Sequence, residues 1–178
     1  MTGRMAVSIM EIDNQTAKGA DVVESETKIV NLADAPEFLE GVSRWLWLEW
    51  AKADGYTLEE IVYRTKYASQ KDTVPQTLVA VRDGKPVGVV SLWLNDLKTR
   101  QDLSPWMATL YVKDEYRNLH IGQMLQKASI EAVRALNRYP CLYLITKLDN
   151  YYEKLGWKFV EKAPEGGGVM EKIYRYDF

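Results

Sequence analysis

The stretch that decides the fold is Arg117-Asn118-Leu119-His120-Ile121-Gly122-Gln123-Met124-Leu125. It follows an apolar run, residues 106–112, that predicts a strand, and from Ile121 onward apolar residues recur at helical spacing. A loop that enters a helix leaves backbone N–H groups without partners at the positive end of the helix dipole, which suits a phosphate. Arg117 adds a fixed positive charge and a forked donor. The sequence therefore predicts an anion-binding loop.

This loop resembles motif A of the GNAT N-acetyltransferase superfamily, R/Q-x-x-G-x-G/A, with Arg117, His120 and Gly122 at the defining positions. It is not a Walker P-loop, because no Gly-Lys-Ser/Thr follows, and it lacks the glycine triplet of the dinucleotide fingerprint. His120 stands where the family usually has glycine. Because His is among the non-glycine residues enriched at positive φ, we expect His120 to shape the loop through an uncommon backbone conformation, not to react.

A second motif lies downstream. Tyr152-Glu153-Lys154-Leu155-Gly156-Trp157 is similar to the ending of the family's motif B, and it follows a predicted buried strand, residues 142–146. Two motifs in the expected order are more specific than either one alone. The resemblance covers residues 28–178, for which we expect a single domain, whereas residues 1–27 are expected to be a poorly ordered or peripheral N-terminal extension.

The order of predicted elements is β-α-α-β-β-β-α-β-α-β-β, which indicates an α/β (α+β) protein with one mixed sheet flanked by helices. The resemblance implies the GNAT fold, with a mostly antiparallel central sheet whose fourth and fifth strands are parallel and splayed. Strands are expected at residues 28–32, 77–81, 86–93, 106–112, 141–146, 157–162 and 169–176, and helices at 34–53, 57–69, 121–136 and 149–155. Asp83-Gly84 predicts a hairpin turn between the second and third strands, and Thr57 with Glu60 predicts a capping box at the start of the second helix.

The composition is that of an ordinary globular protein: 178 residues, 47% hydrophobic and 27% charged. A net charge of −2 gives no electrostatic support for a nucleic-acid partner. The single cysteine, Cys141, and the single histidine argue against a disulfide framework and a metal site. No apolar run reaches the roughly 18 residues of a membrane span, and no secretory leader is evident, so we expect a cytoplasmic protein without a membrane partner.

The resemblance implies direct acetyl transfer from acetyl-CoA to the primary amine of a small molecule or a peptide, without a metal or a covalent enzyme intermediate. It assigns the CoA pyrophosphate to the anion-binding loop and the pantetheine and thioester to backbone groups of the fourth strand. The expected cofactor-binding residues are Leu110, Tyr111, Val112, Arg117, Asn118, Leu119, His120, Ile121, Gly122 and Gln123.

Tyr152 occupies the position that the family uses as general acid. A phenol of pKa about 10 can donate a proton to a thiolate whose conjugate thiol has a pKa near 8.5. The alternative is that Tyr152 only packs in a short helix, and on that helix its neighbour Tyr151 would point about 100° away and be the better packing residue.

The base is harder to assign. Glu49 falls on the apolar stripe of the first predicted helix, so it is a candidate acceptor ligand or base, although a glutamate reaching solvent from the stripe edge is the alternative. Asp96 and Asp102 are similar candidates. Two other functions stay open, a non-catalytic sensor of acyl-CoA and a generic nucleotide-binding domain, as does the choice between a monomer and a homodimer.

Overall fold

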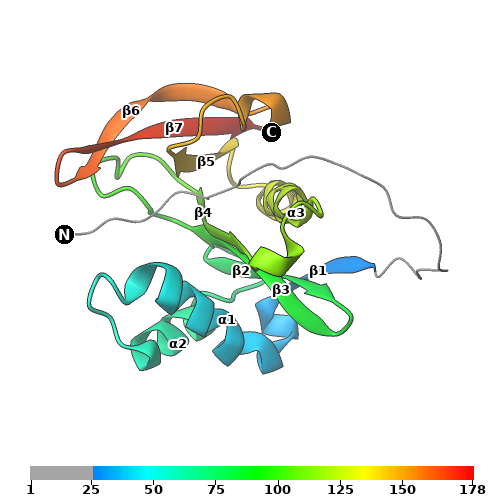
Figure 1. The fold of residues 1–178 in the computed structure, drawn as a ribbon. Helices are drawn as coiled ribbons and strands as arrows, with labels where there is room; N and C mark the ends of the chain where they lie inside the picture. Colours follow the sequence, from blue (N-terminus) through cyan, green and yellow to red (C-terminus); the bar gives the residue numbers. More distant parts are fainter. Residues whose placement is uncertain (1–25) are drawn as a thin grey trace.

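The computed structural model describes residues 26–178 as a seven-stranded sheet with helices on both faces (Figure 1). The extension predicted for residues 1–27 lies outside the described residues except for its last two, of which Thr27 begins the first strand. The strands are β1 (Thr27–Asn31), β2 (Gln76–Arg82), β3 (Lys85–Trp93), β4 (Trp106–Val112), β5 (Cys141–Thr146), β6 (Lys158–Gly166) and β7 (Val169–Asp177). The α-helices are α1 (Leu39–Leu46), α2 (Leu58–Tyr67) and α3 (Ile121–Ala135).

The strands are arranged in the order β1-β2-β3-β4-β5-β7-β6, and among them only β4 and β5 are parallel. Pairing between β4 and β5 is confined to Trp106 opposite Tyr143, next to a backbone bond from the Tyr143 N–H to the Pro105 carbonyl at 2.9 Å. Beyond that point the two strands diverge. This confirms the predicted mixed, mostly antiparallel sheet with a splayed fourth and fifth strand.

Short sequence motifs explain the turn between β2 and β3 and the start of α2. Asp83 and Gly84 join β2 to β3 with positive φ angles of 50° and 69°, as a tight two-residue hairpin turn requires. The Thr57 hydroxyl accepts from the Glu60 N–H at 3.2 Å while the Glu60 carboxylate accepts from the Thr57 N–H at 2.7 Å, so the predicted capping box starts α2.

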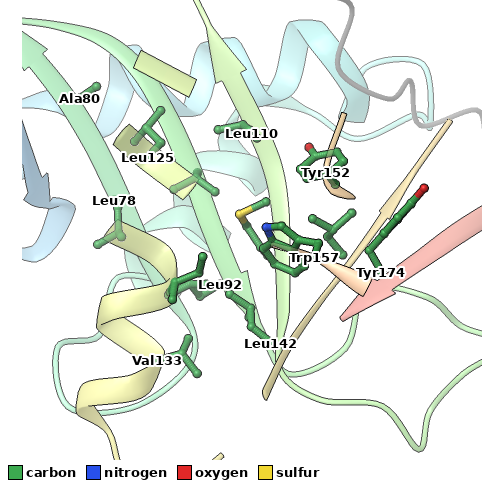
Figure 2. Close-up of a cluster of buried hydrophobic side chains, with 14 of the residues drawn as sticks. Leu78, Ala80, Leu92, Leu110, Leu125, Val133, Leu142, Tyr152, Trp157 and Tyr174 are labelled. Carbon is green, nitrogen blue, oxygen red and sulfur yellow. The ribbon is translucent and has the colours of Figure 1, made fainter. Parts of the chain in front are cut away.

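The sheet separates two hydrophobic clusters. On one face α3 buries Leu125 and Val133 against Leu78, Leu92 and Leu142 of the sheet (Figure 2). On the other face α1 and α2 pack Val42, Leu46 and Ile61 against Val79 and Val89. The helical layers therefore cover β3 and β4 from both faces in the middle of the molecule (Figure 1).

The first predicted helix, residues 34–53, is less regular than expected. Two 3-10 turns, Leu32–Asp34 and Pro36–Phe38, precede α1, and a π-helical turn, Trp47–Ala51, follows it. Asp34, the residue expected to begin this helix, instead pairs with Lys71 at 2.6 Å. The π turn changes the angle between successive side chains, so Glu49 lies on the exposed side and not on the apolar stripe predicted for it.

A β-bulge interrupts β4 at Thr109. The pairing register with β3 shifts between Val89 and Ser91, and Thr109 has a φ of 50°, which is rare for a β-branched residue. Its hydroxyl donates to the Ser91 hydroxyl at 2.8 Å. The bulge bends β4 within the part that is no longer paired with β5, and strained backbone of this kind is concentrated at functional sites.

Close packing beside the bulge depends on Gly88. A Cβ at this position would lie 2.9 Å from the Tyr111 carbonyl oxygen and 3.1 Å from Leu125 Cδ1. Because the nearer atom is backbone, Gly88→Ala should destabilise the protein by about 1–3 kcal/mol, measured by urea unfolding. The control is Gly41→Ala in α1, where nothing lies within 4 Å and alanine favours the helix. Equal stability of the two variants would contradict this account.

Candidate functional site

The loop between β4 and α3 has the shape of an anion-binding concavity. Asn118 and His120 have positive φ angles of 66° and 56°, which confirms the uncommon conformation predicted for His120. The first helical bond of α3 runs from the Met124 N–H to the His120 carbonyl at 3.0 Å. The N–H groups of Ile121, Gly122 and Gln123 therefore have no acceptor within the helix. Where left-handed and right-handed residues alternate along the backbone, as they do here, successive N–H groups turn toward one bound anion.

Arg117 is fixed at the base of this loop. Its Nε donates to the Val112 carbonyl at 3.3 Å, and its Nη2 lies 2.7 Å from Asp114 Oδ1. These contacts tie the loop to the end of β4 and offset part of the positive charge. A guanidinium has five N–H donors, and these two bonds leave others for a phosphate.

Gly122 has no packing role that would require glycine. A Cβ there would meet only Val112 Cγ2, at 4.0 Å, which is ordinary van der Waals contact. Leu119 and His120 before it and Gln123 after it are exposed. The open face at Gly122 allows a ligand to approach the helix backbone closely.

The second half of β4 presents a backbone edge beside this loop. Tyr111 and Val112 pair with Val89 and Gly88 of β3, whereas in the described structure no β4 residue after Trp106 pairs with β5. Leu110 is buried and contributes to the α3-side core. The β5-facing backbone of residues 110–112 is thus left available to an extended polar ligand.

Tyr152 lies in the core at the end of this gap, only 3% exposed. Its ring centroid is 6.0 Å from those of Trp157 and Tyr174, and burial raises the pKa of its phenol. Figure 2 shows the ring near Leu110 of β4 with the hydroxyl pointing away from Trp157. The ring of Tyr152 therefore packs in the core, as the alternative reading expected. The hydroxyl is the only group of this side chain that could donate a proton.

Tyr151, the residue expected to pack better, is only half-buried. The helix predicted over residues 149–155 is reduced to a 3-10 turn, Glu153–Leu155, because Asn150 has a φ of 57°. Burial raises the pKa of Tyr151, and a side-chain hydrogen bond with Gln123 lowers it. This bond connects the motif B segment to the first turn of α3.

The candidate bases do not gather at one place. Glu49 is exposed and is not among the described residues that line the pocket on the α1–α2 side of the sheet, although its charge, after burial and Asp114, contributes to raising the pKa of Tyr111 in β4. Asp102 is held by Arg100 at 2.7 Å, and this hydrogen bond lowers its pKa to about 2, which makes it a poor proton acceptor. Asp96 also lies outside that pocket.

The pocket itself lies on the α1–α2 side of the sheet, and the sequence does not predict it. Thr109 and Ser91 form part of its wall, with Asp54, Arg64 and Trp93. Asp54 sits in a stretch, Ala53-Asp54-Gly55, that has the composition of an ordinary turn, so its position could not be read from the sequence.

A family model described as Acetyltransferase (GNAT) family matches residues 39–157, which include both motifs. The chain belongs to the GNAT acetyltransferase family. The matched region runs from α1 through Trp157 and contains the loop between β4 and α3, the bulged strand β4 and Tyr152. No match was found among curated proteins.

Solved GNAT structures share the fold at low identity. An aminoglycoside 6'-N-acetyltransferase complexed with coenzyme A is 18% identical, with a TM-score of 0.65 over 84% of this chain and 96% of that chain. A GNAT-family acetyltransferase from Streptococcus pneumoniae is 18% identical, with a TM-score of 0.65 over 85% and 99%. The NatC complex bound to Gag peptide and CoA contains a chain that is 16% identical, with a TM-score of 0.59 over 86% and 99%.

Residues 26–178, the part of the chain that the structure describes, contain neither a membrane-spanning helix nor a metal-binding cluster. None of their helices is long and apolar enough to cross a membrane. Nor do they hold a group of three or more His, Cys, Asp and Glu side chains arranged for a metal ion.

Proposed function

We propose that this protein is an N-acetyltransferase that transfers an acetyl group from acetyl-CoA directly to a primary amine. The observation that supports this most is the early end of β4–β5 pairing at Trp106, which in the described structure leaves the edge of β4 unpaired as far as Val112, beside the start of α3. It leaves a strand edge for the amide groups of pantetheine and, at one end of that edge, backbone donors for the pyrophosphate. The two features lie on consecutive segments of the chain.

The residues present fit this co-substrate. Backbone N–H groups from Asn118 to Gln123 and the remaining donors of Arg117 would hold the pyrophosphate, and Gly122 offers the open surface that a bulky phosphate needs. His120 would keep the loop in its left-handed conformation. The backbone edge of residues 110–112 would hold the pantetheine arm and orient the thioester.

Bound acetyl-CoA supplies an activated acetyl group and a thiolate leaving group. A backbone N–H of the β4 edge that points at the thioester oxygen stabilises negative charge there, an effect worth about 2.7–4 kcal/mol for comparable oxyanion donors. The Tyr152 hydroxyl would hold the proton that the leaving sulfur receives. The phenol is protonated at neutral pH, and burial, which raises its pKa, makes it a weaker acid than a free phenol, so it would donate as negative charge develops on the sulfur.

The acceptor amine belongs either to a small molecule or to a peptide. Structural neighbours include an aminoglycoside acetyltransferase and a complex that binds a peptide, so both kinds of acceptor occur on this fold. Because the sequence identities are only 18% and 16%, these neighbours support only the general reaction.

The test is an acceptor screen with acetyl-CoA. We expect free CoA thiol to appear in proportion to enzyme and amine, together with a product that is heavier by one acetyl group. Mass spectrometry of the product distinguishes transfer from simple thioester hydrolysis. Tight binding of acetyl-CoA without turnover of any amine would instead support the non-catalytic acyl-CoA sensor, and stabilisation by ATP or NAD alone would support generic nucleotide binding.

A further inference from the structure

The segment that joins β5 to Tyr152, residues 147–151, has little backbone structure of its own. In the described structure its N–H and C=O groups make no backbone–backbone hydrogen bond outside the β5–β7 ladder, and Asn150 turns the chain with a φ of 57°. After Tyr152 the backbone holds itself, because the N–H groups of Leu155 and Trp157 donate to the Tyr152 carbonyl at 3.0 and 3.1 Å. On the β5 side, the position of Tyr152 therefore depends on side chains.

Lys172 of β7 supplies the main contact to this segment. Its side chain is only 15% exposed. Its Nζ donates to the carbonyls of Lys147 and Leu148, at 3.1 and 3.4 Å, and to the carboxylate of Asp149. A lysine ammonium has three N–H donors, and these three acceptors match them. Because the acceptors belong to consecutive residues, one ammonium group fixes the course of the chain as it leaves β5.

Strand pairing places Lys172 at this point. β7 lies between β5 and β6, and Lys172 is opposite Thr146, the last residue of β5 (Figure 1). The Thr146 hydroxyl adds a further contact, since it accepts from the Leu148 N–H at 3.1 Å. The buried Glu171 carboxylate lies 3.4 Å from Lys147 Nζ. Because successive strand residues face opposite sides, Glu171 and Lys172 contact Lys147 from opposite faces of the sheet.

The same face of β7 also carries the packing surface of Tyr152. Residues two apart on a strand share a face, so Lys172 and Tyr174 project from one side of β7. The ring centroid of Tyr174 is 6.0 Å from that of Tyr152 (Figure 2). Leu148, whose carbonyl Lys172 binds, packs against the core cluster that contains both tyrosines. A shift of the chain at Leu148 would therefore displace the Tyr152 hydroxyl.

We propose that Lys172 is a positioning residue for the acetyl transfer: its ammonium group holds residues 147–149 so that the Tyr152 hydroxyl meets the leaving sulfur. This inference rests on the proposed function, in which Tyr152 donates the proton that the sulfur receives. Lys172 acts only through Tyr152 and transfers no proton itself. A misplacement of about 1 Å caused by a change far from the chemistry can cost up to about 100-fold in rate, so such a contact affects turnover.

The first experiment replaces Lys172 by methionine, which keeps an unbranched side chain and removes the ammonium group. We expect kcat to fall roughly tenfold, less than the full contribution of a general acid, because the hydroxyl is displaced and not deleted. The acetyl-CoA dissociation constant and the KM for the amine should change little. Single-turnover kinetics with acetyl-CoA and the amine of highest turnover in the acceptor screen give the measurement.

Two further variants serve as references. Lys172→Arg retains the charge and the N–H donors and should restore most of the lost kcat. Lys158→Met is the matched control, because Lys158 is an exposed lysine of β6 that pairs with Asp177 at 2.9 Å, and its kcat should equal that of the wild type. A loss of kcat in Lys158→Met as large as that in Lys172→Met would overturn the assignment.

The second experiment combines Lys172→Met with Tyr152→Phe. A residue that acts only through the Tyr152 hydroxyl has no effect once that hydroxyl is absent, so kcat of the double variant should equal that of Tyr152→Phe alone. A purely structural role for Lys172 would instead lower kcat by the same factor in both backgrounds and would overturn the proposal.

Thr146→Val keeps the proposal testable if Lys172→Met fails to fold. It retains the β-branched shape and removes the acceptor of the Leu148 N–H, so kcat should fall severalfold, but not in the Tyr152→Phe background. Titration with acetyl-CoA gives the folded fraction of each variant. An unchanged kcat in both single variants would overturn the positioning role and leave the acetyltransferase intact. Absence of CoA release by the wild type with every amine would overturn the proposed function itself.

Discussion

Replacement of Gly122 by glutamate should raise the dissociation constant for acetyl-CoA by more than about 100-fold. The new side chain begins where the first free N–H groups of α3 converge, so it would occupy the pyrophosphate position. It would also place a negative charge against the phosphates, and like charges brought together in this way cost several kcal/mol. Isothermal titration calorimetry with acetyl-CoA gives the measurement.

The protein itself should tolerate this change. A Cβ at Gly122 meets only Val112 Cγ2, at 4.0 Å, so the fold offers no clash that could account for lost binding. Gly41→Glu is the matched control, because Gly41 is an exposed helical glycine of α1 with nothing within 4 Å. Both variants should unfold within a few degrees of the wild type. Normal acetyl-CoA affinity in Gly122→Glu would remove the pyrophosphate assignment.

Replacement of Tyr152 by phenylalanine should lower kcat by roughly 100-fold, the lower end of what a general acid contributes. The change deletes only the hydroxyl and keeps the ring contacts with Trp157 and Tyr174, so the melting temperature and acetyl-CoA affinity should change little. Single-turnover kinetics with a saturating amine measure the effect on the chemical step.

The pH dependence supplies a second readout. Because burial raises the pKa of Tyr152 above its usual value of about 10, the phenol remains protonated as pH increases through about 9, and kcat should not fall on the alkaline side below that point. If kcat instead declined with a midpoint well below about pH 10, a group other than Tyr152 would be the acid.

Tyr174→Phe is the control for this variant. It removes a hydroxyl from a neighbouring buried ring, one that donates to Glu153 Oε1 at 2.5 Å, and should leave kcat unchanged. An unchanged kcat in Tyr152→Phe would exclude Tyr152 as an important acid. A large loss in Tyr151→Phe instead would assign the role to the neighbouring tyrosine, whose side chain reaches Gln123.

The parts of this molecule that can be predicted from sequence are those governed by local chemistry. The left-handed conformation of His120, the hairpin at Asp83-Gly84 and the capping box at Thr57 each depend on a few neighbouring residues, and the structure confirms all three. The sheet topology follows from the order of the elements together with the resemblance carried by two motifs.

The parts that could not be predicted depend on irregular backbone or on distant partners. The π turn after Leu46 alters the helical spacing and places Glu49 in solvent, and a positive φ at Asn150 replaces a helix by a 3-10 turn. Asp54 comes into one pocket with Thr109 only through tertiary folding. The bulge at Thr109 has no signal in its own sequence, since threonine usually favours regular strands.

The early end of β4–β5 pairing also bears on aggregation. An unpaired strand edge normally recruits other chains, and proteins protect such edges at the margins of their sheets. Here the edge of β4 lies in the middle of a seven-stranded sheet, between β3 and the diverging β5, where another protein's strand cannot easily enter. The protein can therefore keep main-chain groups ready for a slender ligand without becoming prone to self-association through them.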